Sequence, residues 1–288
     1  MGKWYDKIFI GNPDKDDYSA KDLPKTRLEQ YFDVIKLRFG GMITANILFS
    51  LFAIPLILWV LFSLYMLAKG ETTPGNQITA EQVTDLISDS GIWRFFFLVN
   101  IPLYTIMGPA QAGLYYCLRN WMWNERATVG EHFWKEFKRS WLRAAGLNLF
   151  NATLFYAGFW WLLFLYMNME TYPIFKWISV TIIVILILYY MSTIYQFPQL
   201  VTYDLKVTQI IKNSCIYLIV QFPRTLIAVV IYALLMLACV WLREFLLAVA
   251  MSLGFSFVAL GNMILSDFMF DKYVNAPEKR RKGMAPQK

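Results

Sequence analysis

The sequence predicts an all-α integral membrane protein with six transmembrane helices. Of the 288 residues, 58% are apolar and only 16% are charged, whereas a soluble domain has about 25% charged residues. Six long apolar segments lack charges in their central parts, and the basic residues gather in the connections on one side of them. We therefore expect one membrane domain, residues 27–275, between an amino-terminal segment 1–26 and a basic tail 276–288.

The six spans are expected wherever about 20 mostly apolar residues follow one another. Charges or turns rich in Gly and Pro bound each of them. They cover residues 41–68, 93–118, 144–169, 173–203, 224–242 and 245–266. The last two spans are separated by a short hairpin at Arg243 and Glu244, and the loop 69–92 is expected to hold a short helix that begins near Thr79.

The distribution of basic residues predicts the orientation. With six spans, both termini lie on one side of the membrane, and that side holds 23 of the 27 Lys and Arg residues. Because basic loops stay in the cytoplasm, we expect both termini there and the protein in the cytoplasmic (plasma) membrane. This asymmetry accounts for the net charge of +7 without a nucleic-acid partner.

Residues 133–141, FWKEFKRSW, predict an amphipathic helix before the third span. At 3.6 residues per turn, one face carries aromatic side chains and the other carries charges. The aromatic residues are Phe133, Trp134, Phe137 and Trp141, and the charged residues are Lys135, Glu136, Lys138 and Arg139. We expect the aromatic face to lie in the headgroup region of the bilayer and the charged face to meet water, lipid headgroups or a soluble partner.

The same design precedes the first span and predicts an internal repeat. Aligning Phe32 with Trp134 brings Lys36 onto Lys138, and Arg38 adds a second basic residue. The apolar face of this first helix is formed by Leu28, Tyr31, Phe32, Ile35 and Phe39. A weaker third copy contains Ile211 and Lys212, so the repeating unit is an interfacial helix, an odd span and an even span. The expected breaks before the odd spans are Gly40–Gly41, residues 144–146 and Pro223.

Proline and small residues mark the inner ends of the even spans. The second span contains Gly108, Pro109, Gln111 and Gly113, and the fourth contains Pro198. Because proline frees a carbonyl and small residues let helices approach closely, we expect kinks and close packing there. A ligand or ion site at Gln111 and Gln199 is the alternative.

No catalytic, metal or cofactor site is expected, and we predict that the chain is not an enzyme. It lacks the motifs GxxxxGK[ST], HExxH and GxSxG, and His132 is its only histidine. The span centres hold no ionisable residue, which disfavours proton-coupled transport. Neutral amides remain in the spans, and they suit bonds between helices as well as they suit a path for a sugar.

The run GPAQAGLYYCLRNW, followed by FWKEFKRSW, YQFP and FPRTL, resembles the YesL-like family of six-span membrane proteins from Gram-positive bacteria. The resemblance implies an auxiliary subunit of an ABC importer for oligosaccharides or polysaccharide fragments, because members tend to be encoded beside such importers. Its partners would be permease subunits, an ATPase and a sugar-binding protein. The family offers no catalytic residues to transfer. A stand-alone transporter or channel and a membrane assembly or regulatory factor remain as alternatives.

Overall fold

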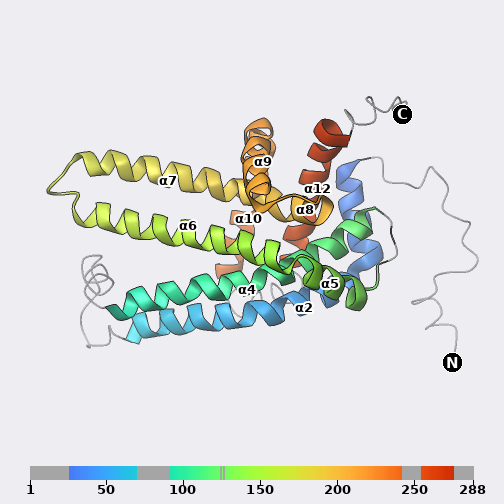
Figure 1. Ribbon diagram of the computed structural model, residues 1–288, viewed down its shortest axis with the longest axis horizontal. Coiled ribbons are helices and arrows are strands. Elements are labelled where there is room, and N and C mark those ends of the chain that lie inside the picture. The colour runs from blue at the N-terminus through green and yellow to red at the C-terminus, as the bar shows by residue number, and fades with distance from the viewer. Residues whose placement is uncertain (1–25, 70–90, 124, 126, 242–253, 276–288) are drawn as a thin grey trace, which may run out of the picture.

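The computed structural model describes residues 26–69, 91–123, 125, 127–241 and 254–275, and every regular element in them is a helix. The predicted all-α class is confirmed. Four long helices run along the long axis of the molecule (Figure 1). They are α2 (Arg27–Lys69), α4 (Gly91–Met122), α6 (Trp141–Met167) and α7 (Ile174–Ser192).

Most of the other helices lie toward the end of the bundle where α2 begins. They are α5 (Val129–Arg139), η1 (Thr193–Tyr195), α8 (Gln196–Thr202), α9 (Val207–Val220), α10 (Phe222–Trp241), α12 (Phe255–Met269) and the π-helix η3 (Phe270–Asn275). In Figure 1, α9 and α12 run across the long axis rather than along it. This arrangement differs from six parallel spans.

Three helical segments of the described chain are long and apolar enough to cross a membrane, where the sequence predicted six. They are Arg27–Ser63, Trp141–Met167 and Ile174–Thr202. Val207–Val220 and Phe222–Leu234, which meet at a bend of 97°, make a fourth if they form one broken span. The expected span 93–118 lies inside α4, in which the side chains of residues 91–97 are outside the described part, and the expected span 245–266 is described only from residue 254 onward, mostly as α12.

Each amphipathic helix is separated from the apolar helix after it by one residue with non-helical dihedral angles. These residues are Arg38 (φ −122°, ψ 20°), Ser140 (φ −99°, ψ 10°) and Gln221 (φ −116°, ψ 26°). The breaks therefore fall a few residues before Gly40–Gly41, residues 144–146 and Pro223, where the sequence predicted them. Gly40 and Gly41 lie within α2 instead. Pro223 lies in the first turn of α10, where a helix accepts proline.

The hydrophobic core lies at the end of the bundle where the short helices gather. Its largest cluster joins α2, α4, α5, α6, α8, α9 and α12. The α6–α7 hairpin extends away from this core, and only 11% of the apolar window of each of its two candidate spans is buried. The molecule is thus well packed at one end and open along the hairpin (Figure 1).

Some expectations lie outside the described residues. These are the structure of the segment before Thr26, the helix near Thr79, the hairpin at Arg243 and Glu244, and the tail 276–288.

Candidate functional site

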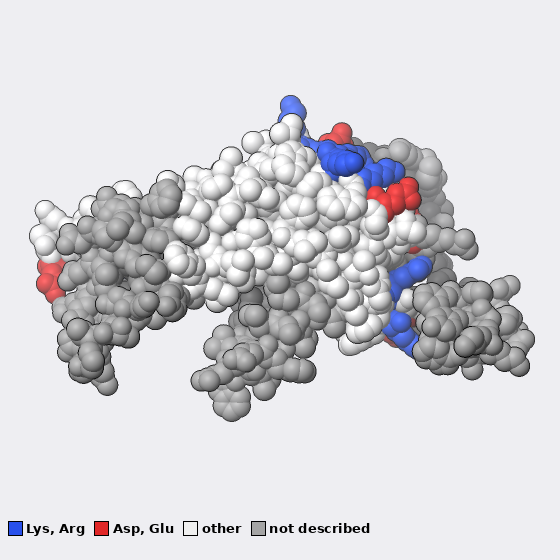
Figure 2. All heavy atoms as spheres, turned by 90° about the horizontal axis from the view of Figure 1, so that it is seen from below, with Lys and Arg blue, Asp and Glu red and all other residues white. Residues whose placement is uncertain are grey.

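Charged side chains gather at the well-packed end of the molecule. Figure 2 shows Lys, Arg, Asp and Glu at this end, while the middle of the visible face is uncharged. We call it the charged end; its basic side chains come from α2, α4, α5, α6, α9 and η3. At the opposite end, the α6–α7 connection carries Glu170, and Lys176 follows it in α7.

Helix α5 is held against the protein by its aromatic face. It begins after Thr128, which has extended dihedral angles, as a residue before a helix usually does. Phe133 is 0% exposed and Phe137 is 9% exposed, and the ring of Phe137 lies 5.0 Å from that of Phe52 in α2. The bilayer therefore does not cover these two rings, contrary to the sequence prediction. Only Trp134 (39% exposed) and Trp141 (41% exposed) still reach the surface.

The charged face of α5 also differs from the prediction at one residue. Glu136 is buried, 2% exposed, rather than turned to water. Its Oε1 accepts a hydrogen bond from Ser140 Oγ, and its Oε2 lies 3.6 Å from Arg139 Nη1. Lys135 and Lys138 remain exposed. Glu136 is buried because the packed stripe runs through Phe133, Glu136, Phe137 and Ser140, which are three or four residues apart on one face.

Helices α5 and α6 pack closely against two glycines of α4. A Cβ on Gly113 would lie 2.9 Å from the carbonyl oxygen of Phe133, and one on Gly108 would lie 2.7 Å from the carbonyl carbon of Ala144. Helix α4 is continuous through Pro109. The GPAQAG stretch thus forms the surface on which α5 and the start of α6 rest.

The other residues that the sequence singled out lie in separate places. Pro198 is buried in α8, after the η1 turn that interrupts the helix from α7. Pro223 is the second residue of α10. Gln111 accepts a hydrogen bond from Asn148 of α6 (2.9 Å), whereas Gln199 donates to Ser214 of α9 (2.8 Å). The side chains of the two glutamines therefore bond to different helices rather than to each other.

Neutral polar side chains connect the helices inside the bundle. Asn151 of α6 donates to Gln196 of α8 (2.7 Å) and accepts from Tyr189 of α7 (2.6 Å). Asn262 of α12 donates to Tyr115 of α4 (2.8 Å) and accepts from Tyr232 of α10 (2.9 Å). These bonds join different helices and suit a low-dielectric interior because neither partner is charged.

Arg119 joins α4 to α8. It donates to the carbonyl oxygen of Val201 and to Asn120 Oδ1 (2.8 Å). Its guanidinium also lies 4.4 Å from the ring centre of Tyr116 and 4.8 Å from that of Trp123. The Arg-Asn pair behind the GPAQAG stretch is therefore a structural contact between two helices.

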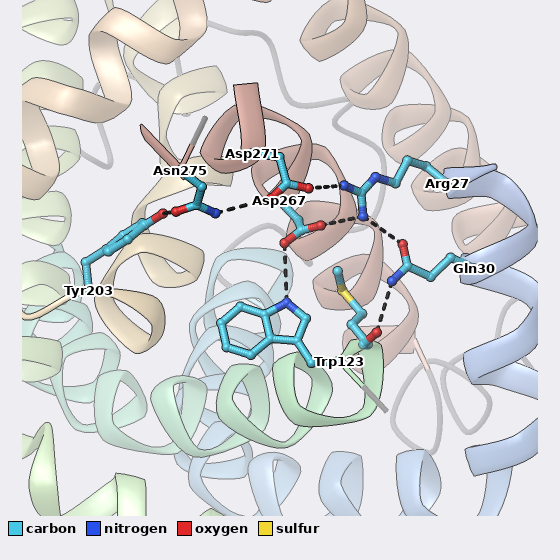
Figure 3. Close-up of polar contacts among 8 residues, drawn as sticks. Arg27, Gln30, Trp123, Tyr203, Asp267, Asp271 and Asn275 are labelled. Atoms are coloured by element: carbon cyan, nitrogen blue, oxygen red, sulfur yellow. Dashed lines mark hydrogen bonds and ion pairs between the residues drawn. The ribbon is translucent and has the colours of Figure 1, made fainter. Parts of the chain in front are cut away.

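The first and last described helices are joined by an ion cluster (Figure 3). Arg27 at the start of α2 forms ion pairs with Asp267 of α12 and Asp271 of η3. Trp123 Nε1 donates to Asp267 Oδ1 (3.4 Å), and Gln30 Nε2 donates to the carbonyl oxygen of Met122 (3.0 Å). We call these residues the Arg27 cluster; it ties α2, α4 and α12 together at the charged end.

Burial raises the pKa of Asp267 above its ordinary value, although the nearby Arg27 guanidinium acts in the opposite direction. Sequence reasoning missed this cluster because Arg27 and Asp267 are 240 positions apart in the chain. The available signal was Asp267 itself, an acidic residue directly after an apolar run.

Within the described ranges, no three His, Cys, Asp or Glu side chains are grouped so that they could hold a metal ion. His132 is partly exposed, and its ring stacks on that of Tyr116 at 6.2 Å between centres.

The fold and the charged end define an all-helical protein whose long apolar helices are compatible with a membrane. Residues 86–169 are similar to a family described as protein of unknown function, DUF624. The matched residues include all of α4, α5 and α6, the unit built on Gly108 and Gly113. No curated protein and no solved structure matches the chain.

Proposed function

We propose that this protein is a non-catalytic auxiliary membrane subunit of an ATP-driven importer for oligosaccharides or polysaccharide fragments, and that it packs against the permease subunits. The α6–α7 hairpin carries this proposal. Only 11% of the apolar window of each of its candidate spans is buried, against 28% for the window in α2. A hairpin with so little internal packing has room for other transmembrane helices.

Helix α7 is open on most of its circumference. Ile178, Val180, Ile183, Ile185 and Leu188 are all exposed, and at 100° per residue these positions are spread over most of the circumference of the helix. A helix at the edge of a self-sufficient bundle has one lipid-facing side. The exposure of α7 on several sides therefore supports a partner helix beside it, packed through van der Waals contacts.

The charged end supports a cytoplasmic contact as well. Because Phe133 and Phe137 fix α5 to the bundle, the exposed Lys135 and Lys138 stand on a rigid helix. They offer a basic surface to the ATPase or to an acidic loop of a permease. The resemblance to the YesL-like family supports the choice of a carbohydrate importer.

The proposal includes a cytoplasmic-membrane location, six spans and cytoplasmic termini. It also includes a three-fold repeat of an amphipathic helix and two spans. The breaks at Arg38, Ser140 and Gln221 support this repeat because each separates an amphipathic helix from an apolar one.

Site-specific photo-crosslinking in intact cells tests the proposal. A photoreactive amino acid at Ile183 or Val184 of α7 is expected to crosslink to a permease subunit of an importer, identified by mass spectrometry. The same group at Leu51, on the exposed side of α2, is the matched control and is expected to yield lipid adducts instead. Absence of a permease adduct from both α7 positions would contradict the proposal. Solute flux through vesicles that contain only this chain would favour a stand-alone transporter.

A further inference from the structure

We propose that residues 27–38, the first segment of α2, form a membrane-surface helix that inserts Leu28 and Phe32 into a bilayer containing anionic phospholipid. This inference needs the membrane location but no importer partner. Leu28 is 72% exposed and Phe32 is 64% exposed. Large apolar side chains with such exposure, one turn apart on one helix, need an apolar environment.

The segment has three distinct sides. Val34 is buried, and Tyr31 and Ile35 pack against the core, so one side faces the protein. Lys36 is exposed on a second side, which suits water. Leu28 and Phe32 lie between these two sides at 100° per residue. A helix at a bilayer surface needs this order of protein, lipid and water sides.

Helix α5 has a similar sequence pattern but a different environment. Its rings Phe133 and Phe137 are buried against α4 and α2, so little of its apolar face is left for lipid. In residues 27–38, Phe32 aligns with Trp134 of α5, and its side chain is 64% exposed against 39% for Trp134. The structure therefore assigns the insertion to the first segment of α2 rather than to both helices.

The exposed apolar side chains continue from this segment along α2. Beyond the break at Arg38, Phe39, Ile47, Leu51 and Leu58 are all exposed. Together with Thr44 and Pro55 they form an uncharged stripe at intervals of three to five residues along one candidate span. Figure 1 shows that the start of α2 turns away from its long part. Because α2 bends at Arg38, a lipid-facing stripe along both of its parts would extend from the core of the bilayer to its surface.

The basic residues next to the break favour an anionic bilayer surface, whereas the acidic Glu29 and Asp33 lie nearer the start of the segment. Lys36 and Arg38 are exposed next to the break, where the chain would enter the bilayer, and neither forms an ion pair within the described residues. Arg27 at the far end is occupied by Asp267 and Asp271. Each basic residue at an anionic surface strengthens binding about fivefold.

Cysteines introduced one at a time and labelled with an environment-sensitive fluorophore test this inference in proteoliposomes of the purified full chain. Phe32→Cys probes the lipid side, and Asp33→Cys, at a partly exposed position on the side of Lys36, is the matched control. In vesicles of phosphatidylcholine mixed with phosphatidylglycerol, the probe at position 32 is expected to emit at shorter wavelength and to resist a water-soluble quencher, whereas the control does not. Labelled wild type reports the signal of the native cysteines Cys117, Cys215 and Cys239.

The lipid dependence supplies the second measurement. Replacing phosphatidylglycerol by phosphatidylcholine, or Lys36 and Arg38 by glutamine, is expected to increase quenching at position 32 without changing the control. Equal quenching at positions 32 and 33 in anionic vesicles would overturn the inference. So would a probe that is shielded only when another protein is co-reconstituted, because the face would then belong to that partner.

Discussion

At the scale of single residues, the two glycines of α4 explain why the GPAQAG stretch has its composition. A side chain at Gly108 would press on the backbone of Ala144, and one at Gly113 would press on Phe133. Backbone atoms cannot rotate away as a flexible side chain can. The close approach of α5 and α6 to α4 therefore depends on the missing Cβ atoms.

We predict that Gly108→Ala destabilises the protein by about 1–3 kcal/mol, because overpacking forces helices apart. Gly40 is the matched control, since nothing lies within 4 Å of a Cβ placed there. Gly40→Ala is expected to stabilise α2 by about 0.5–1 kcal/mol through helix propensity. Thermal unfolding in detergent measures both variants, and equal midpoints for the two would contradict the close contact.

Asp267 gives the protein a pH dependence with a defined sign. Burial raises its pKa above 3.8, so the folded protein binds this proton more readily than the unfolded chain. This contribution to stability is fully present below pH 3.8 and is lost as pH rises through the raised pKa. In Asp267→Asn the loss is absent, and the unfolding midpoint of the variant relative to wild type is expected to rise over this pH window.

A second variant separates this effect from simple loss of the ion pair. Arg27→Gln removes the charge that lowers the pKa of Asp267, so the fall in stability is expected to extend to higher pH. Midpoint differences that stay constant with pH in both variants would show that Asp267 does not titrate in this way.

At the scale of elements, α5 packs against the helix bundle rather than lying on lipid alone. The periodicity of FWKEFKRSW predicted the helix and its apolar side, and α5 (Val129–Arg139) covers most of this stretch. It could not predict what covers that side, because protein and lipid are equally apolar partners. Because Gly113 has no side chain, Phe133 can approach the backbone of α4, and the apolar side of α5 is therefore covered by protein.

We predict that Phe133→Ala destabilises the protein by about 3–5 kcal/mol, the usual effect of emptying a packed aromatic site. Trp134→Ala, its neighbour with a partly exposed ring, is expected to have a much smaller effect. Thermal unfolding and limited proteolysis within residues 129–141 measure the two variants. Comparable loss of stability in both would indicate that α5 is not clamped through Phe133.

At the scale of the whole molecule, the two ends differ in their charged residues. Lys135 stands at the charged end and Glu170 at the far end of the α6–α7 hairpin. If α6 crosses the bilayer once, the two residues lie on opposite sides. By the positive-inside tendency we expect the end with Lys135 to face the cytoplasm.

We predict that Lys135→Cys reacts with a membrane-impermeant maleimide only after the cells are opened, and that Glu170→Cys reacts in intact cells. Wild type, with its three native cysteines, controls for background labelling. Labelling of both positions from the same side would contradict a single crossing by α6.

The sequence by itself determined the helical class, the long apolar helices and the close-packing residues, because hydropathy and periodicity are local properties of the chain. Only the tertiary structure decided which amphipathic faces are covered, where the helices break and which distant residues meet. Glu136 is buried and Arg27 binds Asp267 because neighbouring helices bring partners to them. Such contacts depend on how helices pack in three dimensions, and no local pattern in the chain specifies that packing.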